Sequence, residues 1–226
     1  VSGLGTGSLY TNNSDSDLEI IDGELWQKDG GELIIDNRKW RLDAGGARRF
    51  YDDKLRHPWT NGLASFLIKW FESANQIESM TSGSTGKPKV IKHSRVAIIA
   101  SANDTLQFFN LENRSKLILA LPIEFIAGKM MVIRAITGNH DLIAVNSNLE
   151  KLWDIEADFV ALTPHQLSKI TKNRTLASFP SVKTILLGGS PASDRLLSLI
   201  PSHINVYEGY GMTETITHVA LRKRVH

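Results

Sequence analysis

The chain has 226 residues, of which 42% are hydrophobic and 22% charged, and its formal net charge is +2. This composition is typical of a globular chain of one to two domains with a hydrophobic core. So small a net charge gives no reason to expect nucleic acid or an anionic membrane as a partner. The absence of cysteine excludes a disulfide framework and a thiol nucleophile on this chain. No apolar run approaches the roughly 20 residues of a membrane helix, and the first residues do not resemble a signal peptide, so we expect a cytoplasmic protein.

The first 30 residues differ in composition from the rest of the chain. They are rich in Gly, Ser, Asn and Asp, and Asp22-Gly23 between short apolar runs predicts a β-hairpin. After Gly30 and Gly31, the runs 33–35 and 39–42 predict a second small β unit. The sequence therefore predicts a tail, residues 1–30, and a main domain, residues 31–226.

From residue 60 onward, helical and strand patterns alternate. Apolar residues from Leu63 to Phe71 recur with helical spacing and predict a core-facing helix. The predicted strands are 77–80, 90–93, 117–120, 141–145, 159–162, 184–187 and 204–207, and the predicted helices are 96–109, 129–137, 164–171 and 194–200. This alternation predicts an α/β fold with a parallel sheet flanked by helices, preceded by small β-hairpin units. Ligands of such sheets bind in the loops after the carboxyl ends of the strands.

The segment directly after the first of these strands carries the strongest chemical signal. It reads Thr81, Ser82, Gly83, Ser84, Thr85, Gly86, Lys87, Pro88 and Lys89. Glycine lets backbone N–H groups approach an anion, hydroxyls donate hydrogen bonds and lysines supply charge, so the segment suits a polyphosphate. Its spacing is not that of a Walker A loop, because only two residues separate the glycines and proline follows Lys87. A surface Gly/Ser turn is the alternative.

Two further glycine-containing segments follow predicted strands. One contains Glu208, Gly209, Tyr210, Gly211, Thr213 and Glu214. Glu214 is a hard oxygen ligand that suits Mg²⁺ held mainly by phosphate and water. The other contains Gly188, Gly189, Ser190 and Pro191, where the glycines could let a flat base lie against the backbone. The alternatives are a glycine-rich turn with a solvated glutamate for the first and a plain strand-to-helix turn for the second.

Together, the order and spacing of these three segments resemble the adenylate-forming enzymes, which include acyl-CoA synthetases, luciferases and the adenylation domains of peptide synthetases. The resemblance covers roughly Gly31 to the C-terminus and implies their large N-terminal domain, truncated before the C-terminal lid. It implies ATP and Mg²⁺ as cofactors and coenzyme A as co-substrate. The implied roles are phosphate binding by residues 81–89 and Thr213, adenine binding by residues 188–191 and 208–210, and further cofactor binding by Gly211. Catalysis is implied for Lys87, Thr213 and Glu214, and Mg²⁺ binding for Glu214.

Residues 120–129 resemble the acyl-pocket segment of the same family, although many members carry His where Phe125 stands. The candidate substrate-binding residues are Phe125, Gly128, Lys129 and Arg134. Lys129 and Arg134 are five positions apart on one predicted helix, which does not place them squarely on one face. A loose basic wall would suit an acid with more than one carboxylate. A salt-bridged or solvated helix is the alternative.

The stretch of chain before the phosphate loop is short, and in this it resembles the compact o-succinylbenzoate–CoA ligases of menaquinone synthesis. Residues 3–20 resemble the C-terminal tail of o-succinylbenzoate synthase, which implies a piece of a fused synthase–ligase without synthase activity of its own. These resemblances imply a ligase that activates a small-molecule acid as an acyl-adenylate and transfers it to coenzyme A. Without the lid, we expect weakened ATP binding and slow or absent adenylation. The alternatives are another acyl- or aryl-CoA ligase and a non-catalytic nucleotide-binding module.

Overall fold

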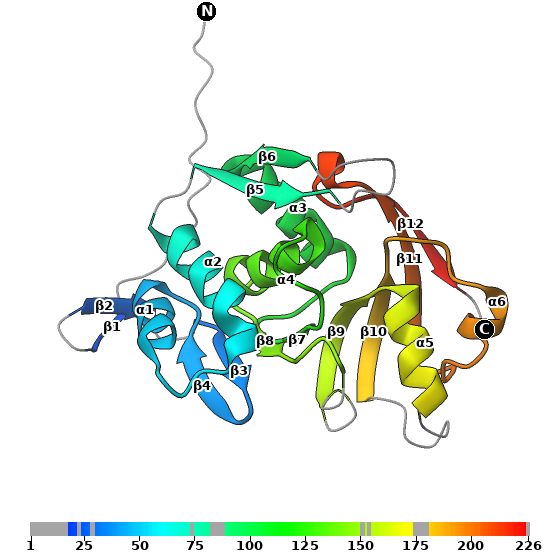
Figure 1. The fold of residues 1–226 in the computed structure, drawn as a ribbon, viewed down its shortest axis with the longest axis horizontal. Helices are drawn as coiled ribbons and strands as arrows, with labels where there is room; N and C mark the ends of the chain where they lie inside the picture. Colours follow the sequence, from blue (N-terminus) through cyan, green and yellow to red (C-terminus); the bar gives the residue numbers. More distant parts are fainter. Residues whose placement is uncertain are drawn as a thin grey trace, which may run out of the picture.

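The structure, a computed structural model, describes residues 18–21, 24–27, 30–72, 75–81, 89–149, 152, 155–173 and 181–224. Its centre is an eight-stranded sheet, shown in Figure 1. In spatial order the strands are β12 (His218–Arg224), β11 (Asn205–Gly211), β10 (Ser181–Leu187), β9 (Glu156–Leu162), β7 (Lys116–Leu119), β8 (Asp141–Ala144), β3 (Glu32–Ile35) and β4 (Arg38–Arg41). The strands from β11 to β3 are parallel, and an antiparallel strand closes each edge. The predicted parallel sheet flanked by helices is confirmed.

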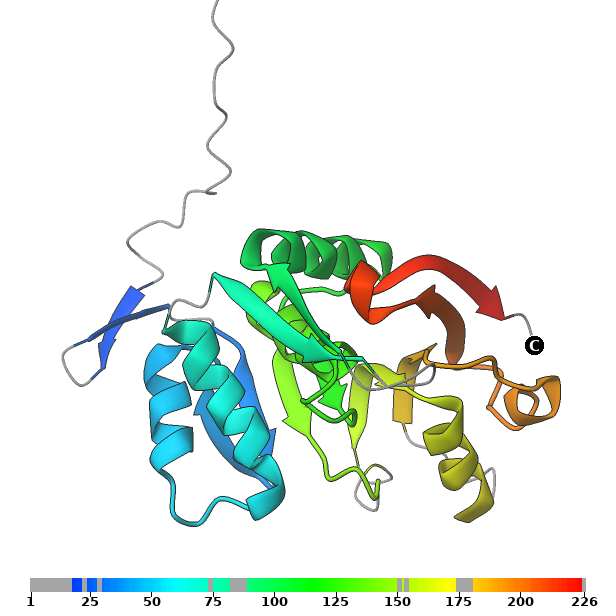
Figure 2. The ribbon, with the colours of Figure 1, turned by 45° about the horizontal axis from the view of Figure 1, so that its top comes forward.

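Helices pack into two core clusters, one on each side of the sheet (Figure 2). The first cluster contains side chains of α1 (Ala44–Asp52), α2 (Asn61–Phe71), α3 (Arg95–Phe108) and α4 (Ile126–Thr137), and the second contains side chains of α5 (Pro164–Asn173) and α6 (Asp194–Leu197). Strand β7 and the residue after it show why both are needed: Leu117 and Leu119 join the first cluster, whereas Ile118 and Ala120 join the second. Successive side chains of a strand point to opposite faces, so an all-apolar strand must be covered twice.

Local sequence signals explain where the helices begin. Ser94 caps α3 by accepting a hydrogen bond from the Ala97 amide, as its position before the helix predicts. Before α5, Thr163 and Gln166 form a reciprocal pair. The Gln166 amide donates to Thr163 Oγ1 at 3.2 Å and the Thr163 amide donates to Gln166 Oε1 at 3.0 Å.

Two predicted strands lie outside the main sheet. β5 (Gln76–Met80) and β6 (Val90–Ser94) pair antiparallel as a hairpin of their own. The connection between them is too short for the crossover that parallel pairing requires. Conversely, the unit formed by β3 and β4 belongs to the main sheet, because β3 pairs with β8 and buries Leu33 and Ile35. Helix α1, with its glycine-rich sequence, and strand β12, with its three basic residues, were not predicted.

The predicted N-terminal hairpin is present as β1 (Leu18–Ile21) and β2 (Glu24–Gln27), which pair antiparallel. Its turn, Asp22-Gly23, and residues 1–17 lie outside the described part of the chain. The resemblance of the tail to a synthase and the domain boundary near residue 30 therefore stay predictions. Among the described helices, none has both the length and the apolar character needed to cross a membrane.

Candidate functional site

Four loops meet at the carboxyl edge of the sheet. In the strand register, Leu187 of β10 lies beside both Leu162 of β9 and Glu208 of β11. The loops after β9 and after β10 therefore leave the sheet beside residues 208–211 of β11, which stay paired with β12. The loop after β7 joins them, because Gln166 Nε2 donates to the Ala120 carbonyl oxygen at 2.7 Å. Three predicted site segments, 120–129, 188–191 and 208–214, are thus brought to one edge.

Glu208 ties the two segments proposed to frame the adenine. Its Oε1 accepts a hydrogen bond from the Ala192 amide at 3.1 Å, so β11 holds the loop after β10. Its Oε2 accepts from Arg222 at 2.6 Å and pairs with Arg224 Nε at 2.5 Å, both on β12. Burial alone would raise the pKa of Glu208, but the hydrogen bonds from Arg222, Ala192 and Arg224 outweigh it and the pKa is lowered. Glu208 is therefore ionised at neutral pH, and its carboxylate links β12 to the loop after β10.

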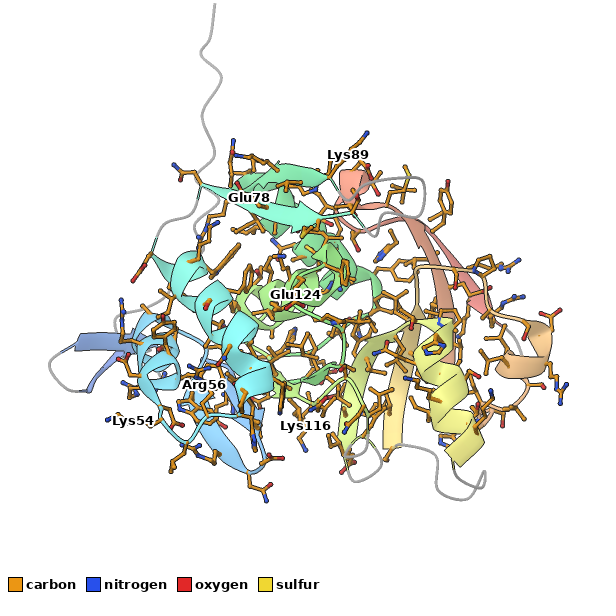
Figure 3. All side chains as sticks on the ribbon, in the orientation of Figure 1. Lys54, Arg56, Glu78, Lys89, Lys116 and Glu124 are labelled. Atoms are coloured by element: carbon orange, nitrogen blue, oxygen red, sulfur yellow. The ribbon has the colours of Figure 1, made fainter. Side chains whose placement is uncertain are left out.

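Residues 82–88 of the phosphate loop lie outside the described part of the chain. The roles predicted for Ser82, Gly83, Ser84, Thr85, Gly86 and Lys87 therefore stay predictions. The two ends of this loop are described. The Thr81 amide donates to the Lys89 carbonyl oxygen at 2.9 Å, and the Lys89 amide donates to Thr81 Oγ1 at 3.0 Å. The Thr81 hydroxyl thus closes the neck of the loop, while Lys89 is exposed at the end of the hairpin (Figure 3).

The hairpin that carries this loop contacts the segment that carries Thr213 and Glu214. His93 of β6 donates from Nε2 to the Thr213 carbonyl oxygen at 2.6 Å. Figure 1 shows β5 and β6 beside the short turn that follows β11. Thr213 is half-buried and Glu214 is exposed in the 3-10 turn Thr213–Thr215. An exposed carboxylate on a turn that is bonded to the hairpin of this loop suits the oxygen ligation that Mg²⁺ prefers.

The candidate acid-binding residues do not form one basic wall. Phe125 is exposed just before α4, and Lys129 Nζ donates to the Glu124 carbonyl oxygen at 2.8 Å. Burial lowers the pKa of Lys129. Gly128 has a packing role, because a Cβ there would lie 2.2 Å from the Pro122 carbonyl oxygen. Glu124 is labelled near the start of α4 in Figure 3.

Arg134 is 2% exposed, and its hydrogen-bond partners differ from that of Lys129. Its Nη2 donates to Thr217 Oγ1 at 2.9 Å and to Thr105 Oγ1 at 3.3 Å. Within the described residues no carboxylate pairs with it, its Nε has no hydrogen-bond partner, and burial lowers its pKa to about 10. A buried guanidinium of this kind is costly to desolvate unless an anion joins it.

Sequence reasoning missed Gln166, Thr217 and the arginines of β12 as parts of this edge. The T-x-x-Q pattern at residues 163–166 is a capping-box signal that could have drawn attention to Gln166. The other contacts join residues far apart in the chain, such as His93 and Thr213, and no local pattern announces them.

His218 makes the stability of the folded chain depend on pH in a way that can be measured. Burial, followed by the nearby charge of Arg134, lowers its pKa to about 4 from the usual 6.5. Since the unfolded chain binds this proton first, the stability contributed by neutral His218 is complete above about pH 6.5 and lost as the pH falls toward 4. Replacing His218 by Gln is therefore expected to flatten the loss of stability in this window, measured by urea unfolding at pH 7.5, 5.5 and 4.5. The control is His203→Gln at an exposed position, and equal flattening in both variants would contradict the assignment.

Comparison with known proteins assigns the family. The family model described as "AMP-binding enzyme" matches residues 79–226, which is more than half of the chain. The chain therefore belongs to the AMP-binding enzyme family of adenylate-forming ligases, as the three loop segments predict.

Two relatives are similar over most of the chain. A 2-succinylbenzoate–CoA ligase of Listeria monocytogenes is 28% identical over 224 residues, which cover 96% of this chain and 46% of that ligase. An acyl-CoA synthetase-like protein of Dyadobacter fermentans is 31% identical with a TM-score of 0.69, over 80% of this chain and 53% of that protein. The chain thus spans less than half of the Listeria ligase.

A third solved structure shares the fold at lower identity. The o-succinylbenzoate coenzyme A synthetase of Bacillus subtilis, in complex with ATP and a magnesium ion, is 23% identical with a TM-score of 0.57. The match covers 65% of this chain and 32% of that protein.

Proposed function

We propose that this chain is the nucleotide- and acid-binding part of an o-succinylbenzoate–CoA ligase. The observation that carries the proposal is the His93–Thr213 contact, which joins the hairpin that carries the predicted phosphate loop to the Thr213–Glu214 segment. The similarity to 2-succinylbenzoate–CoA ligase supports the choice of acid. In the proposed reaction a carboxylate of the acid attacks the α-phosphorus of ATP, an acyl-adenylate forms and pyrophosphate leaves. The coenzyme A thiol then displaces AMP.

The nucleotide would lie across the carboxyl edge of the sheet. Residues 188–191 and 208–210, which the bond from the Ala192 amide to Glu208 holds near one another, would frame the adenine. Lys87, Lys89, Thr213 and the loop N–H groups would bind the phosphates, and Glu214 would hold Mg²⁺. Mg²⁺ there would neutralise phosphate charge. Because carboxylates are weak nucleophiles, positioning and charge neutralisation would supply most of the catalysis.

Arg134 is the residue we propose for the second carboxylate of the acid. Since the described residues offer it no carboxylate, a substrate carboxylate would supply the missing negative charge. That carboxylate would take the place of one of the two threonine hydroxyls that Arg134 now contacts. Phe125, Gly128 and Lys129 would border the remainder of the acid.

The direct test is acid-dependent pyrophosphate release by the longer ligase, meaning the whole protein of which we propose this chain to be a part. o-Succinylbenzoate is expected to be the best substrate in a panel that includes benzoate, succinate and a medium-chain fatty acid. If another acid is preferred, the proposed substrate is wrong but the proposed ligase activity stands. If no acid releases pyrophosphate, and replacing Lys87 or Glu214 leaves nucleotide binding unchanged, the ligase proposal fails.

A further inference from the structure

The segment that carries Thr213 and Glu214 is held in a strained turn. Ile216 has φ 69° and ψ −57°, and the Thr217 amide donates to the Thr215 carbonyl oxygen at 2.8 Å. These values describe a γ-turn, which is rare and unfavourable for a β-branched residue. Gly211 approaches the same turn so closely that a Cβ would lie 2.2 Å from the Thr217 carbonyl oxygen. Such a backbone persists only when its surroundings hold it.

Side chains from two other elements contact this turn. Arg134 of α4 donates to Thr217 at its far end. His93 of β6 donates to the Thr213 carbonyl oxygen at its near end, 2.6 Å away. Because a carbonyl oxygen can only accept, Nε2 of His93 must carry a hydrogen. His93 is 9% exposed, so the bond is shielded from competing water.

The position of His93 on β6 gives this bond a consequence for nucleotide binding. His93 pairs in register with Ile77 of β5, and Thr81 and Lys89 directly flank the other end of the same hairpin. The His93 side chain thus connects the hairpin that carries the phosphate loop to the backbone of Thr213. Movement of the Thr213 backbone away from β6 would break the bond.

Resting on the proposed function, we infer that His93 is a positioning residue that fixes Thr213 and Glu214 relative to the β5–β6 hairpin, which carries the phosphate loop. It contacts neither nucleotide nor metal in this assignment. It acts through the Thr213 backbone, and its effect falls on ligands that span both segments. Mg²⁺-bound ATP spans them with its triphosphate, whereas AMP lacks the β- and γ-phosphates.

The test compares two variants of the 226-residue chain by calorimetric titration with Mg·ATP and with AMP. His93→Leu removes the donor, and loss of one buried hydrogen bond is expected to weaken Mg·ATP binding about tenfold, with AMP binding within about threefold of the unmodified chain. His93→Gln keeps an N–H donor at similar reach and is expected to restore Mg·ATP affinity. His203→Leu, at an exposed position before β11, is the matched control.

The outcomes separate this inference from the proposed function. If the unmodified chain binds neither Mg·ATP nor AMP, the proposed function fails. If it binds Mg·ATP and His93→Leu binds equally well, the positioning role is wrong. Equal weakening of both nucleotides in His93→Leu and His93→Gln, with a lowered melting temperature, would show a purely structural histidine and would also overturn the inference.

Discussion

Replacing Glu214 by Gln is expected to lower acid-dependent pyrophosphate release by the longer ligase about 100-fold. Gln keeps the size of the side chain but removes the negative charge that would hold Mg²⁺ against the phosphates. Since Glu214 is exposed, the free energy of unfolding is expected to change little. Raising the Mg²⁺ concentration should recover part of the lost rate.

The matched control for Glu214 is Glu156, an exposed glutamate at the amino end of β9, on the opposite edge of the sheet. Glu156→Gln is expected to leave the rate unchanged. A Glu214→Gln enzyme with normal turnover and normal Mg²⁺ dependence would show that the metal is held elsewhere.

The second large effect is expected at Arg134, where a substitution should lower the kcat/KM for the acid without lowering the stability of the fold. Arg134→Met keeps much of the volume and removes a buried cation that has no carboxylate partner among the described residues. Replacing such a group by an apolar side chain is often neutral or stabilising. The kcat/KM for o-succinylbenzoate is nevertheless expected to fall about 10- to 100-fold, because a charge-assisted hydrogen bond to the acid is lost.

Benzoate provides the internal comparison for Arg134→Met, because it has one carboxylate and that group is consumed in the reaction. Its kcat/KM is expected to change less than threefold. Arg222→Met, at a more exposed arginine on β12, controls for the loss of charge, although its bond to Glu208 makes a moderate effect on ATP affinity acceptable. Equal losses for o-succinylbenzoate and benzoate in Arg134→Met would make Arg134 a structural residue of the Thr217 turn.

Much of the fold could be predicted because its signals are local. The apolar runs of β7, β9 and β10 and the caps of α3 and α5 each depend on neighbouring residues. The same is true of the three loop segments that led to the adenylate-forming family, which the match of residues 79–226 confirms. The site assignments themselves remain predictions, and those at residues 82–88 lie outside the described part of the chain.

Other features depend on pairings that no local pattern encodes. β3 and β4 read as an independent unit, yet their buried face requires β8 and the helices beside it. β5 and β6 read as strands of the parallel sheet, yet the short loop between them forces a hairpin. Lys129 and Arg134 read as at most a loose basic wall on one helix, yet Lys129 contacts the Glu124 carbonyl and Arg134 is buried against Thr105 and Thr217.

The sequence by itself determined the class of fold and the chemistry of the loops, because hydrophobic periodicity and the density of glycine, hydroxyl and lysine residues are properties of short segments. The tertiary structure alone decided which of these segments are in contact. Hydrogen bonds such as His93 to Thr213 and Glu208 to Ala192 form between strands and loops that only the completed sheet brings within reach. Their strength depends on burial, which is a property of the packed molecule and not of any one segment.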